Sequence, residues 1–173
     1  MIFKGTATAL ITPFTEDDKV DVQAIRNIVD MQIANGINAL VALGTTGEPA
    51  TLSEEEKEQI VRVCVEQTSG KIPLIVGAGS NSTRQAVETC RMAQKLGADA
   101  LLVVTPYYNK CTQEGLVEHY GAIAEATSLP IICYNVASRT GVNILPETFA
   151  RIATEHKNVV AIKEASGNME QIE

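Results

Sequence analysis

Short apolar runs alternate with helical patterns along the whole chain, and no other feature limits the fold as strongly. The runs are rich in β-branched residues and bounded by turn formers, which is typical of buried strands. They lie near residues 6–12, 38–43, 73–77, 99–104, 130–135 and 158–163. Helical patterns lie near 21–35, 53–68, 82–96, 113–127 and 146–155, and another helix begins after the last strand. Repeated βα units of this kind predict a parallel sheet.

Residues at the predicted helix ends support these boundaries. Ser53 and Glu56 have the spacing of a capping box, in which each side chain bonds the backbone amide of the other residue. Gly36 and Gly97 directly follow two helical patterns, where a left-handed residue is preferred. Pro146 falls in the first turn of another helix, where no amide donor is needed.

Two architectures fit such units, an open doubly wound sheet and a (β/α)8 barrel. A dinucleotide-binding sheet carries G-x-G-x-x-G after its first strand, whereas Gly77-Ala78-Gly79 follows the third strand and matches only in part. Polar motifs follow nearly every strand instead, which is typical of a barrel. We therefore predict an α/β fold, a (β/α)8 TIM barrel present as a single partial domain over residues 1–173 with six strands. The last two βα units and the C-terminal helices are expected to be absent.

Composition and charge exclude several functions. The net charge is −7 without a Lys/Arg cluster, so nucleic acid is not an expected partner. No apolar run reaches the roughly 18 residues of a membrane span, and no secretory signal is recognisable, so we expect a cytoplasmic protein. Four cysteines lack C-x-x-C spacing and form no ligand pattern with the two histidines, so no metal is expected.

Lys163 ends the last predicted strand and is the strongest chemical signal. It follows the apolar run 159–162, and an ammonium at the end of a buried strand is costly. Val159 and Ala161 share its face by the two-residue period, so we expect dry surroundings. A lysine amine attacks a carbonyl only when neutral, and an apolar environment favours that form. Lys163 is therefore predicted to form a Schiff base, although a single lysine at a strand end is more often simply solvated.

Other polar segments follow the ends of earlier strands and would open on the same face of a barrel. Tyr134 is a candidate for proton transfer, assisted by Thr45 and Tyr108. Arg139 is suited to bind a carboxylate through its planar fork of donors. Each residue also has a purely structural explanation, such as packing a loop, forming a tight turn or pairing with a surface carboxylate. Only the combination favours chemistry.

Together these segments resemble the dihydrodipicolinate synthase family, also called the 4-hydroxy-tetrahydrodipicolinate synthase family, among the pyruvate-dependent class I aldolases. The resemblance extends from Gly5 to the last residue, and it corresponds to the N-terminal part of a longer protein. The motifs that carry it are Gly44-Thr45-Thr46-Gly47-Glu48, Pro106-Tyr107-Tyr108-Asn109, Tyr134-Asn135-Val136, Ser138-Arg139-Thr140-Gly141 and Ile162-Lys163-Glu164-Ala165.

The resemblance implies a lyase that condenses pyruvate with L-aspartate 4-semialdehyde in the diaminopimelate route to lysine. Lys163 would form the Schiff base with pyruvate, and Thr46 with the amides of its turn would hold the pyruvate carboxylate. Tyr134, Thr45 and Tyr108 would make the proton relay, with Tyr108 contributed by a neighbouring subunit. Arg139 would bind the carboxylate of the semialdehyde.

The same resemblance implies no metal or organic cofactor, and a homo-oligomer, a dimer or a tetramer, for the full-length protein. Ala137 and Cys111 stand where the family usually has proline, which removes no chemical group. Lysine-sensitive members carry His, His and Glu where this chain has Glu54, Lys57 and Gln85. We therefore expect weak or absent inhibition by lysine.

Three other interpretations stay open. A sister aldolase, such as N-acetylneuraminate lyase or a keto-deoxy sugar-acid aldolase, shares the lysine and the tyrosine but typically lacks the Ser-Arg-Thr-Gly segment. The chain could instead be a catalytically silent fragment, stable only as an oligomer or with a complementary piece. A nucleotide-binding α/β module would rest on Gly77-Ala78-Gly79 alone.

Overall fold

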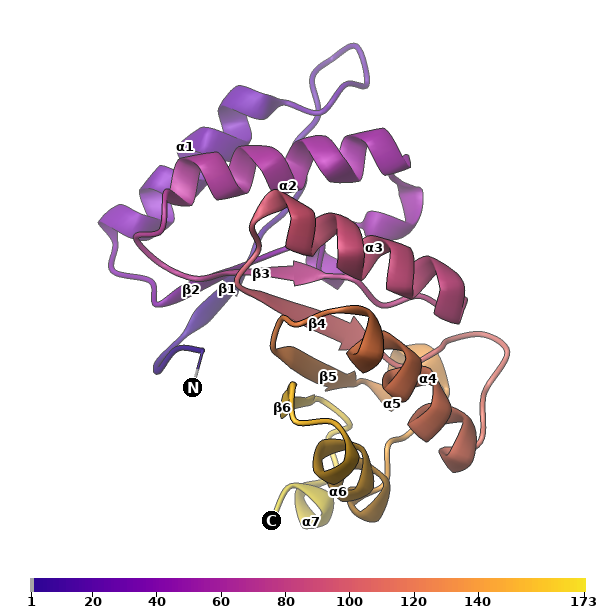
Figure 1. Ribbon diagram of the computed structural model, residues 1–173. Helices are drawn as coiled ribbons and strands as arrows, with labels where there is room; N and C mark the ends of the chain where they lie inside the picture. The colour runs from indigo at the N-terminus through magenta and orange to yellow at the C-terminus, as the bar shows by residue number, and fades with distance from the viewer. Residues whose placement is uncertain (1) are drawn as a thin grey trace. The chain divides into compact units, whose positions relative to one another are not determined.

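The computed structural model describes residues 2–173 (Figure 1). The chain divides into two compact units, which are described one after the other. The first unit comprises the residues up to Gly77 together with Met92–Ala100. The second unit comprises Ala78–Arg91 and Leu101–Glu173.

The first unit is built on three parallel strands in chain order, counted within the described residues. They are β1 (Ala7–Ala9), β2 (Ala39–Ala42) and β3 (Leu74–Gly77). The central strand β2 is buried along its whole length, because it has a neighbour on both edges and its apolar side chains are covered on both faces. Helices α1 (Val22–Ala34) and α2 (Glu54–Thr68) follow β1 and β2, and they pack against each other (Figure 1).

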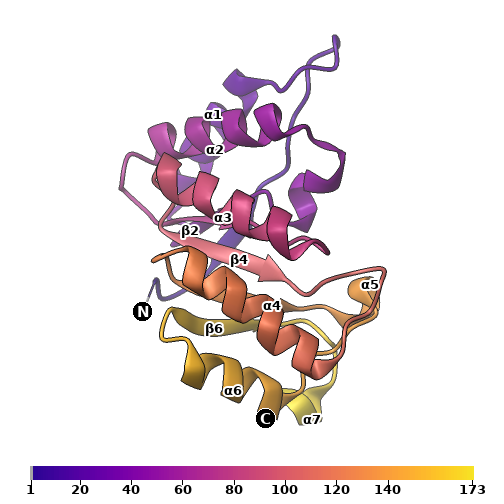
Figure 2. The ribbon, with the colours of Figure 1, turned by 45° about the vertical axis from the view of Figure 1, so that its right-hand side comes forward.

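The second unit repeats this pattern with β4 (Ala100–Val104), β5 (Ile131–Asn135) and β6 (Val159–Glu164), paired in parallel. Helix α4 (Gln113–Ala126) connects β4 to β5, and helix α6 (Pro146–Glu155) precedes β6. These two helices lie side by side (Figure 2). The short helices α5 (Ala137–Thr140) and α7 (Met169–Ile172) follow the ends of β5 and β6. Helix α3 (Thr83–Leu96) has residues in both units.

The predicted strands and long helices are confirmed, and all but one agree with the structure to within one residue. The exception is β1, which ends at Ala9 rather than at residue 12, although the Leu10 amide still donates to the Val41 carbonyl. The capping box of Ser53 and Glu56 is present, and Pro146 is the first residue of α6. The segments that periodicity did not predict are α5 and the 3-10 helices Thr45–Gly47 and Pro49–Thr51, because three or four residues are too few to show a period.

Within residues 2–173, no helix combines the length and the apolar character that crossing a membrane requires.

Gly77 at the end of β3 allows an unusually close approach of two backbone segments in the first unit. A Cβ atom at this position would collide with the carbonyl oxygen of Leu43 and lie 2.9 Å from the amide nitrogen of Gly44. These atoms are backbone, so they cannot turn away as a flexible side chain would. Leu43 itself has a φ of 54°, which is a strained conformation for a bulky residue. Gly77 therefore makes room for the turn that carries Thr45 and Thr46.

We predict that Gly77→Ala destabilises the protein by about 1–3 kcal/mol, because the new methyl group pushes on backbone that cannot relax locally. The measurement is the free energy of unfolding from urea titration. Gly115→Ala in α4 is the matched control, since the same methyl would contact only side-chain atoms of Cys111 and Thr112 at 3.3 and 3.4 Å. Equal effects of the two substitutions would contradict the close approach at Leu43.

His119 is buried inside the second unit and connects α4 to the start of α3. Its Nδ1 atom lies 2.9 Å from the Thr83 hydroxyl, and its ring packs edge-on against Tyr120. Its Nε2 atom is buried without a hydrogen-bond partner among the residues that the structure describes. Burial disfavours the charged imidazolium, so it lowers the pKa of His119 to about 4.

The pKa of His119 predicts a loss of stability in mild acid. An unfolded histidine has a pKa near 6.5, so between about pH 6.5 and 4 the unfolded state binds the proton more tightly than the folded state. The stability contributed by neutral His119 is complete above that window and is lost as the pH falls through it. His119→Gln should flatten the pH dependence of the unfolding free energy in this window, measured by urea titration at several pH values. An unchanged slope would argue against a neutral buried imidazole.

Candidate active site

Tyr134 and Lys163 lie directly opposite each other on the paired strands β5 and β6. The Nζ atom of Lys163 is 4.1 Å from the centroid of the Tyr134 ring, a distance at which an ammonium is attracted to the ring face. Tyr134 is 8% exposed. The two residues that the sequence ranks first for chemistry are therefore in contact, through the register of one strand pair.

The predicted dry surroundings of Lys163 are wrong for the described chain, in which the Lys163 side chain is exposed. One reason is that β6 pairs with β5 on only one edge within residues 2–173. The other reason is a bulge, because Val159 pairs with Ile131 whereas Ala161 pairs with the next residue, Ile132. The extra residue, Val160, shifts the alternation, so that Val159 does not share the face of Lys163.

Thr45 and Thr46 are exposed in the first unit, on the 3-10 helix Thr45–Gly47 that follows β2. Gly44 precedes this helix, and the amide of Gly47 closes it by donating to the Gly44 carbonyl. The Thr12 hydroxyl donates to the Gly47 carbonyl at 2.7 Å, which joins the turn to the segment after β1. The local structure thus presents both threonine side chains to solvent on a well-supported turn.

Arg139 is exposed on α5, just after β5. The helix is held by Thr140, whose buried hydroxyl bonds the carbonyls of Val136 and Val142. Gly141 then ends the helix in the left-handed conformation with a φ of 72°. Arg139 is therefore carried on a rigid turn in the same unit as Tyr134 and Lys163.

Tyr108 is the most exposed large side chain among the predicted site residues, at 90%. Its φ of 74°, in the loop after β4, is rare for an aromatic residue. In the described chain, only Tyr134 and Lys163 are shown in contact with each other. The roles of Tyr108, Arg139, Thr45 and Thr46 stay predictions.

Sequence reasoning missed a polar network beside this pair. Asn135 and Glu164 each follow a residue of the pair, and the Asn135 amide donates to the Glu164 carboxylate at 2.8 Å. Asn143 and Gln171 complete the network. The signal was present, since both Asn135 and Glu164 stand inside the motifs, but neither residue type suggests a reaction with a carbonyl by itself.

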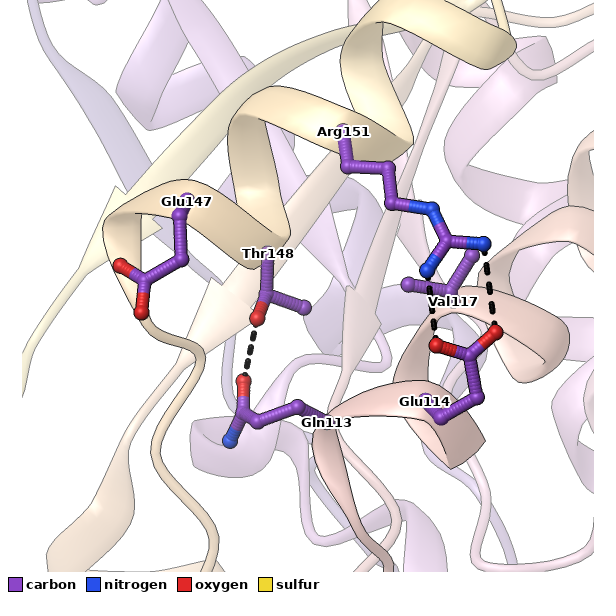
Figure 3. A pocket seen from close by; sticks show the side chains of 6 residues that line it. All are labelled: Gln113, Glu114, Val117, Glu147, Thr148 and Arg151. Atoms are coloured by element: carbon purple, nitrogen blue, oxygen red, sulfur yellow. Dashed lines mark hydrogen bonds and ion pairs between the residues drawn. The ribbon is translucent and has the colours of Figure 1, made fainter.

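A separate pocket of about 300 Å³ lies between α4 and α6 (Figure 3). Two of its charged side chains are paired with each other, because Arg151 binds the Glu114 carboxylate through two nitrogens at 2.7 and 3.2 Å; Arg151 also binds Glu155 at 2.8 Å. Its amide and hydroxyl, from Gln113 and Thr148, bond each other at 2.6 Å. We interpret this pocket as structural, because its lining is joined by an ion pair and a hydrogen bond. The predicted site residues do not line it.

Metal ligands are not grouped in the described part of the chain: residues 2–173 contain no cluster of three His, Cys, Asp or Glu side chains that could hold an ion. The cysteines are free thiols. Burial raises the pKa of three of them to about 12, which makes their thiolate forms scarce; these are Cys64, Cys90 and Cys133.

Comparison with known proteins finds relatives in sequence and in structure. A relative from Geotalea daltonii named 4-hydroxy-tetrahydrodipicolinate synthase is 55% identical over 170 residues, which are 98% of this chain and 58% of the relative. The Acinetobacter baumannii dihydrodipicolinate synthase, solved as a complex with pyruvate, is 48% identical with a TM-score of 0.95 and covers 99% of this chain and 58% of its own. A monomeric dihydrodipicolinate synthase variant is 53% identical with a TM-score of 0.96, and the match covers 99% of this chain and 57% of the variant.

These matches define the fold as that of a TIM barrel, of which this chain contains the first six βα units. The profile of the Dihydrodipicolinate synthetase family matches residues 2–173, and the chain belongs to that family. The chain spans about 58% of the length of the curated relatives it matches.

Proposed function

We propose that the protein carrying this sequence is a 4-hydroxy-tetrahydrodipicolinate synthase, a lyase that condenses pyruvate with L-aspartate 4-semialdehyde in the diaminopimelate route to lysine. The observation that carries the proposal is the Lys163 amine 4.1 Å from the centre of the Tyr134 ring. Membership of the family and the motifs after β2, β4, β5 and β6 support it.

The chemistry starts when the neutral Lys163 amine attacks the ketone carbon of pyruvate. The C–N bond forms, and the ketone oxygen leaves as water after it has taken up protons, which yields an imine. Loss of a proton from the pyruvate methyl group then gives an enamine, whose carbon attacks the aldehyde of the semialdehyde. Tyr134, whose ring lies next to the Lys163 amine, has a phenol that can move protons in these steps.

The remaining site residues take the roles that the family motifs imply. Thr46 and the amides of its turn hold the pyruvate carboxylate, and Thr45 with Tyr108 completes the proton relay. Arg139 binds the carboxylate of the semialdehyde, for which its exposed position on α5 is suited. No cofactor takes part in this scheme.

A sister aldolase is the second candidate. N-acetylneuraminate lyases and sugar-acid aldolases share the lysine and the tyrosine, so the pair itself does not separate the activities. Two segments favour the synthase, namely Gly44–Gly47 and Ser138–Gly141. Turnover with aspartate semialdehyde, compared with turnover of keto-deoxy sugar acids, distinguishes the two.

We also propose a cytoplasmic homo-oligomer, a dimer or a tetramer. The 90% exposure of Tyr108 supports this assembly, because an aromatic side chain so open to water gains from burial against another subunit. One structural relative is a monomeric variant, so the mass in solution has to be measured for this protein.

Weak or absent inhibition by lysine is part of the same proposal. Lys57 bonds Glu54 on α2 at 2.8 Å, and its side chain is 13% exposed. This pair places a cation and its partner at positions where lysine-sensitive members carry histidines. An ion pair closed on itself offers no free partner to an incoming lysine, so we expect weak binding there.

Trapping the imine tests the function. Pyruvate with borohydride should add one reduced pyruvate to the protein, and peptide mapping should place it on Lys163, because reduction makes the C–N bond permanent. Lys163→Ala should remove the adduct. Lys157→Ala is the matched control, since Lys157 is an exposed lysine on the turn before the same strand, and this variant should keep the adduct.

An adduct on another lysine would overturn the assignment of Lys163. If the 173-residue chain folds and forms no adduct while a longer form of the protein does, the chain alone is a silent fragment. If neither forms an adduct, Lys163 is not a Schiff-base residue.

Arg139→Ala should raise the KM for aspartate semialdehyde by about 10- to 100-fold, because a charge-assisted bond to the substrate carboxylate is lost. The rate of imine formation with pyruvate should change little. Steady-state kinetics with each substrate varied in turn provide the measurement, with Arg139→Lys as the variant that keeps the charge but loses the fork. A rise in the KM for pyruvate alone would contradict this role.

A further inference from the structure

The ends of β5 and β6 carry polar side chains on both faces of the strand pair. Tyr134 lies opposite Lys163, and the next residues along the strands, Asn135 and Glu164, also lie opposite each other. Successive side chains of a strand point to opposite faces. The contact between Asn135 and Glu164 therefore lies behind the contact between Lys163 and Tyr134, and it belongs to the same register.

Glu164 accepts every hydrogen bond that it makes in this network. Its Oε1 atom accepts from the Ser166 amide at 2.7 Å, and its Oε2 atom accepts from Asn135 at 2.8 Å and from Gln171 at 2.9 Å. Partial burial raises the pKa of Glu164, but these donated bonds outweigh it and leave the pKa below its ordinary value. The network is therefore built around an ionised carboxylate.

Asn135 is the buried hub of the network, with no exposed surface. It donates to Asn143 and Glu164, both at 2.8 Å, and accepts from the Ile144 amide at 3.0 Å. Asn143 in turn donates to Gln171 on α7 at 2.8 Å. The ends of β5 and β6, the segment before α6, and α7 are joined by this closed set of bonds.

The bulge in β6 explains why the end of the strand needs hydrogen bonds beyond those of the backbone ladder to fix its register. Ile131 pairs with Val159, and the next residue of β5 pairs with Ala161, so Val160 has no place in the ladder. The ladder before the bulge consequently does not determine the pairing after it. A slip by one residue would turn Lys163 to the opposite face of the strand pair.

We propose that Glu164 and Asn135 are positioning residues that hold the end of β6 in the one register that places the Lys163 amine over the Tyr134 ring. The proposal rests on the function proposed above, since it describes how the proposed Schiff-base lysine is held in place on a bulged strand. Neither residue touches the reacting atoms, and both act through the backbone of their neighbours.

The test uses polarity exchange in the full-length protein. Glu164→Gln leaves one acceptor oxygen where there were two. Asn135→Asp places a second carboxylate opposite the carboxylate of Glu164 and removes the donor between them. In the double variant Asn135→Asp/Glu164→Gln, the new amide can donate to the new carboxylate, so the bond between the strands is restored with its direction reversed.

Asn158→Ala is the matched control. Asn158 also joins β6 to the rest of the unit through two amide hydrogen bonds, to the carbonyls of Ala124 and Thr127 at 2.9 and 3.0 Å. It precedes β6 and lies on the far side of the bulge from Lys163. Its loss lowers stability without affecting the register of the strand end.

Two readouts are measured at equal folded fraction, established by circular dichroism. The first is the rate of imine formation with pyruvate, followed by borohydride quenching and intact mass. The second is the proton chemical shift of the Lys163 ε-methylene in ¹³C-lysine-labelled protein, assigned through its loss in Lys163→Arg. Contact with the face of the Tyr134 ring shifts this signal upfield, and this readout requires no reaction.

Each single variant should slow imine formation by at least about tenfold, which corresponds to about 1.4 kcal/mol, and should remove the upfield shift. The double variant should recover part of both, because the bond between the strands returns while those of the exchanged atoms to Asn143 and Gln171 do not. Asn158→Ala should leave both near their native values. The proposal is overturned if Glu164→Gln keeps the native rate and shift, or if Asn158→Ala changes both equally at the same folded fraction.

The shift separates this proposal from the proposed function. If the native protein forms no imine, the function fails, yet the shift still reports whether Glu164 and Asn135 hold Lys163 over the ring. If either single variant does not fold, the other single variant and the double variant give the same comparison.

Discussion

The parallel pairing of β5 with β6 is the interaction on which the site depends. It is a backbone interaction, yet it determines which side chains are neighbours, because the register assigns each residue after the bulge its partner on the other strand. The Lys163–Tyr134 contact and the Asn135–Glu164 contact are two consequences of the same alignment. Because both contacts depend on one register, neither pair can change its partner without the other.

Each unit carries polar candidate residues after the ends of its strands. The first unit contains a hydroxyl-rich turn, for which Gly77 leaves room. The second unit contains the amine, the phenol and the guanidinium on and after paired strands. In both units, strands provide rigid positions and short helical turns present the polar groups, which is the division of labour that parallel α/β folds offer.

Much of the fold was predictable because it rests on local and periodic signals. The apolar runs predicted every strand except β1 to within one residue, and Ser53 with Glu56 predicted the start of α2. The bulge at Val160 was not predictable, because it is a property of how β6 pairs with β5, and a run of apolar residues carries no signal of that pairing. The expectation of a dry Lys163 depended on a strict two-residue period and on a covered outer edge of β6, and residues 2–173 provide neither.

The candidate residues were recognisable as a set, whereas their support was not. The residue types of Tyr134 and Lys163, at the ends of two strands, indicate chemistry from the sequence alone, and the structure places these two residues in contact. Glu164 and Asn135 are ordinary polar residues until their bonds are seen, because a positioning role depends on three-dimensional partners such as Gln171.

The extra residue in β6 has a consequence for how this strand can vary. It divides the strand into two segments whose phases are set separately, the first by packing of Val159 in the core and the second by the polar network behind Lys163. Substitutions that resize the core can therefore shift the first segment by a fraction of a residue without carrying the amine with them. The bulge therefore separates Lys163, whose position must be exact, from Val159, which only has to fill space in the core.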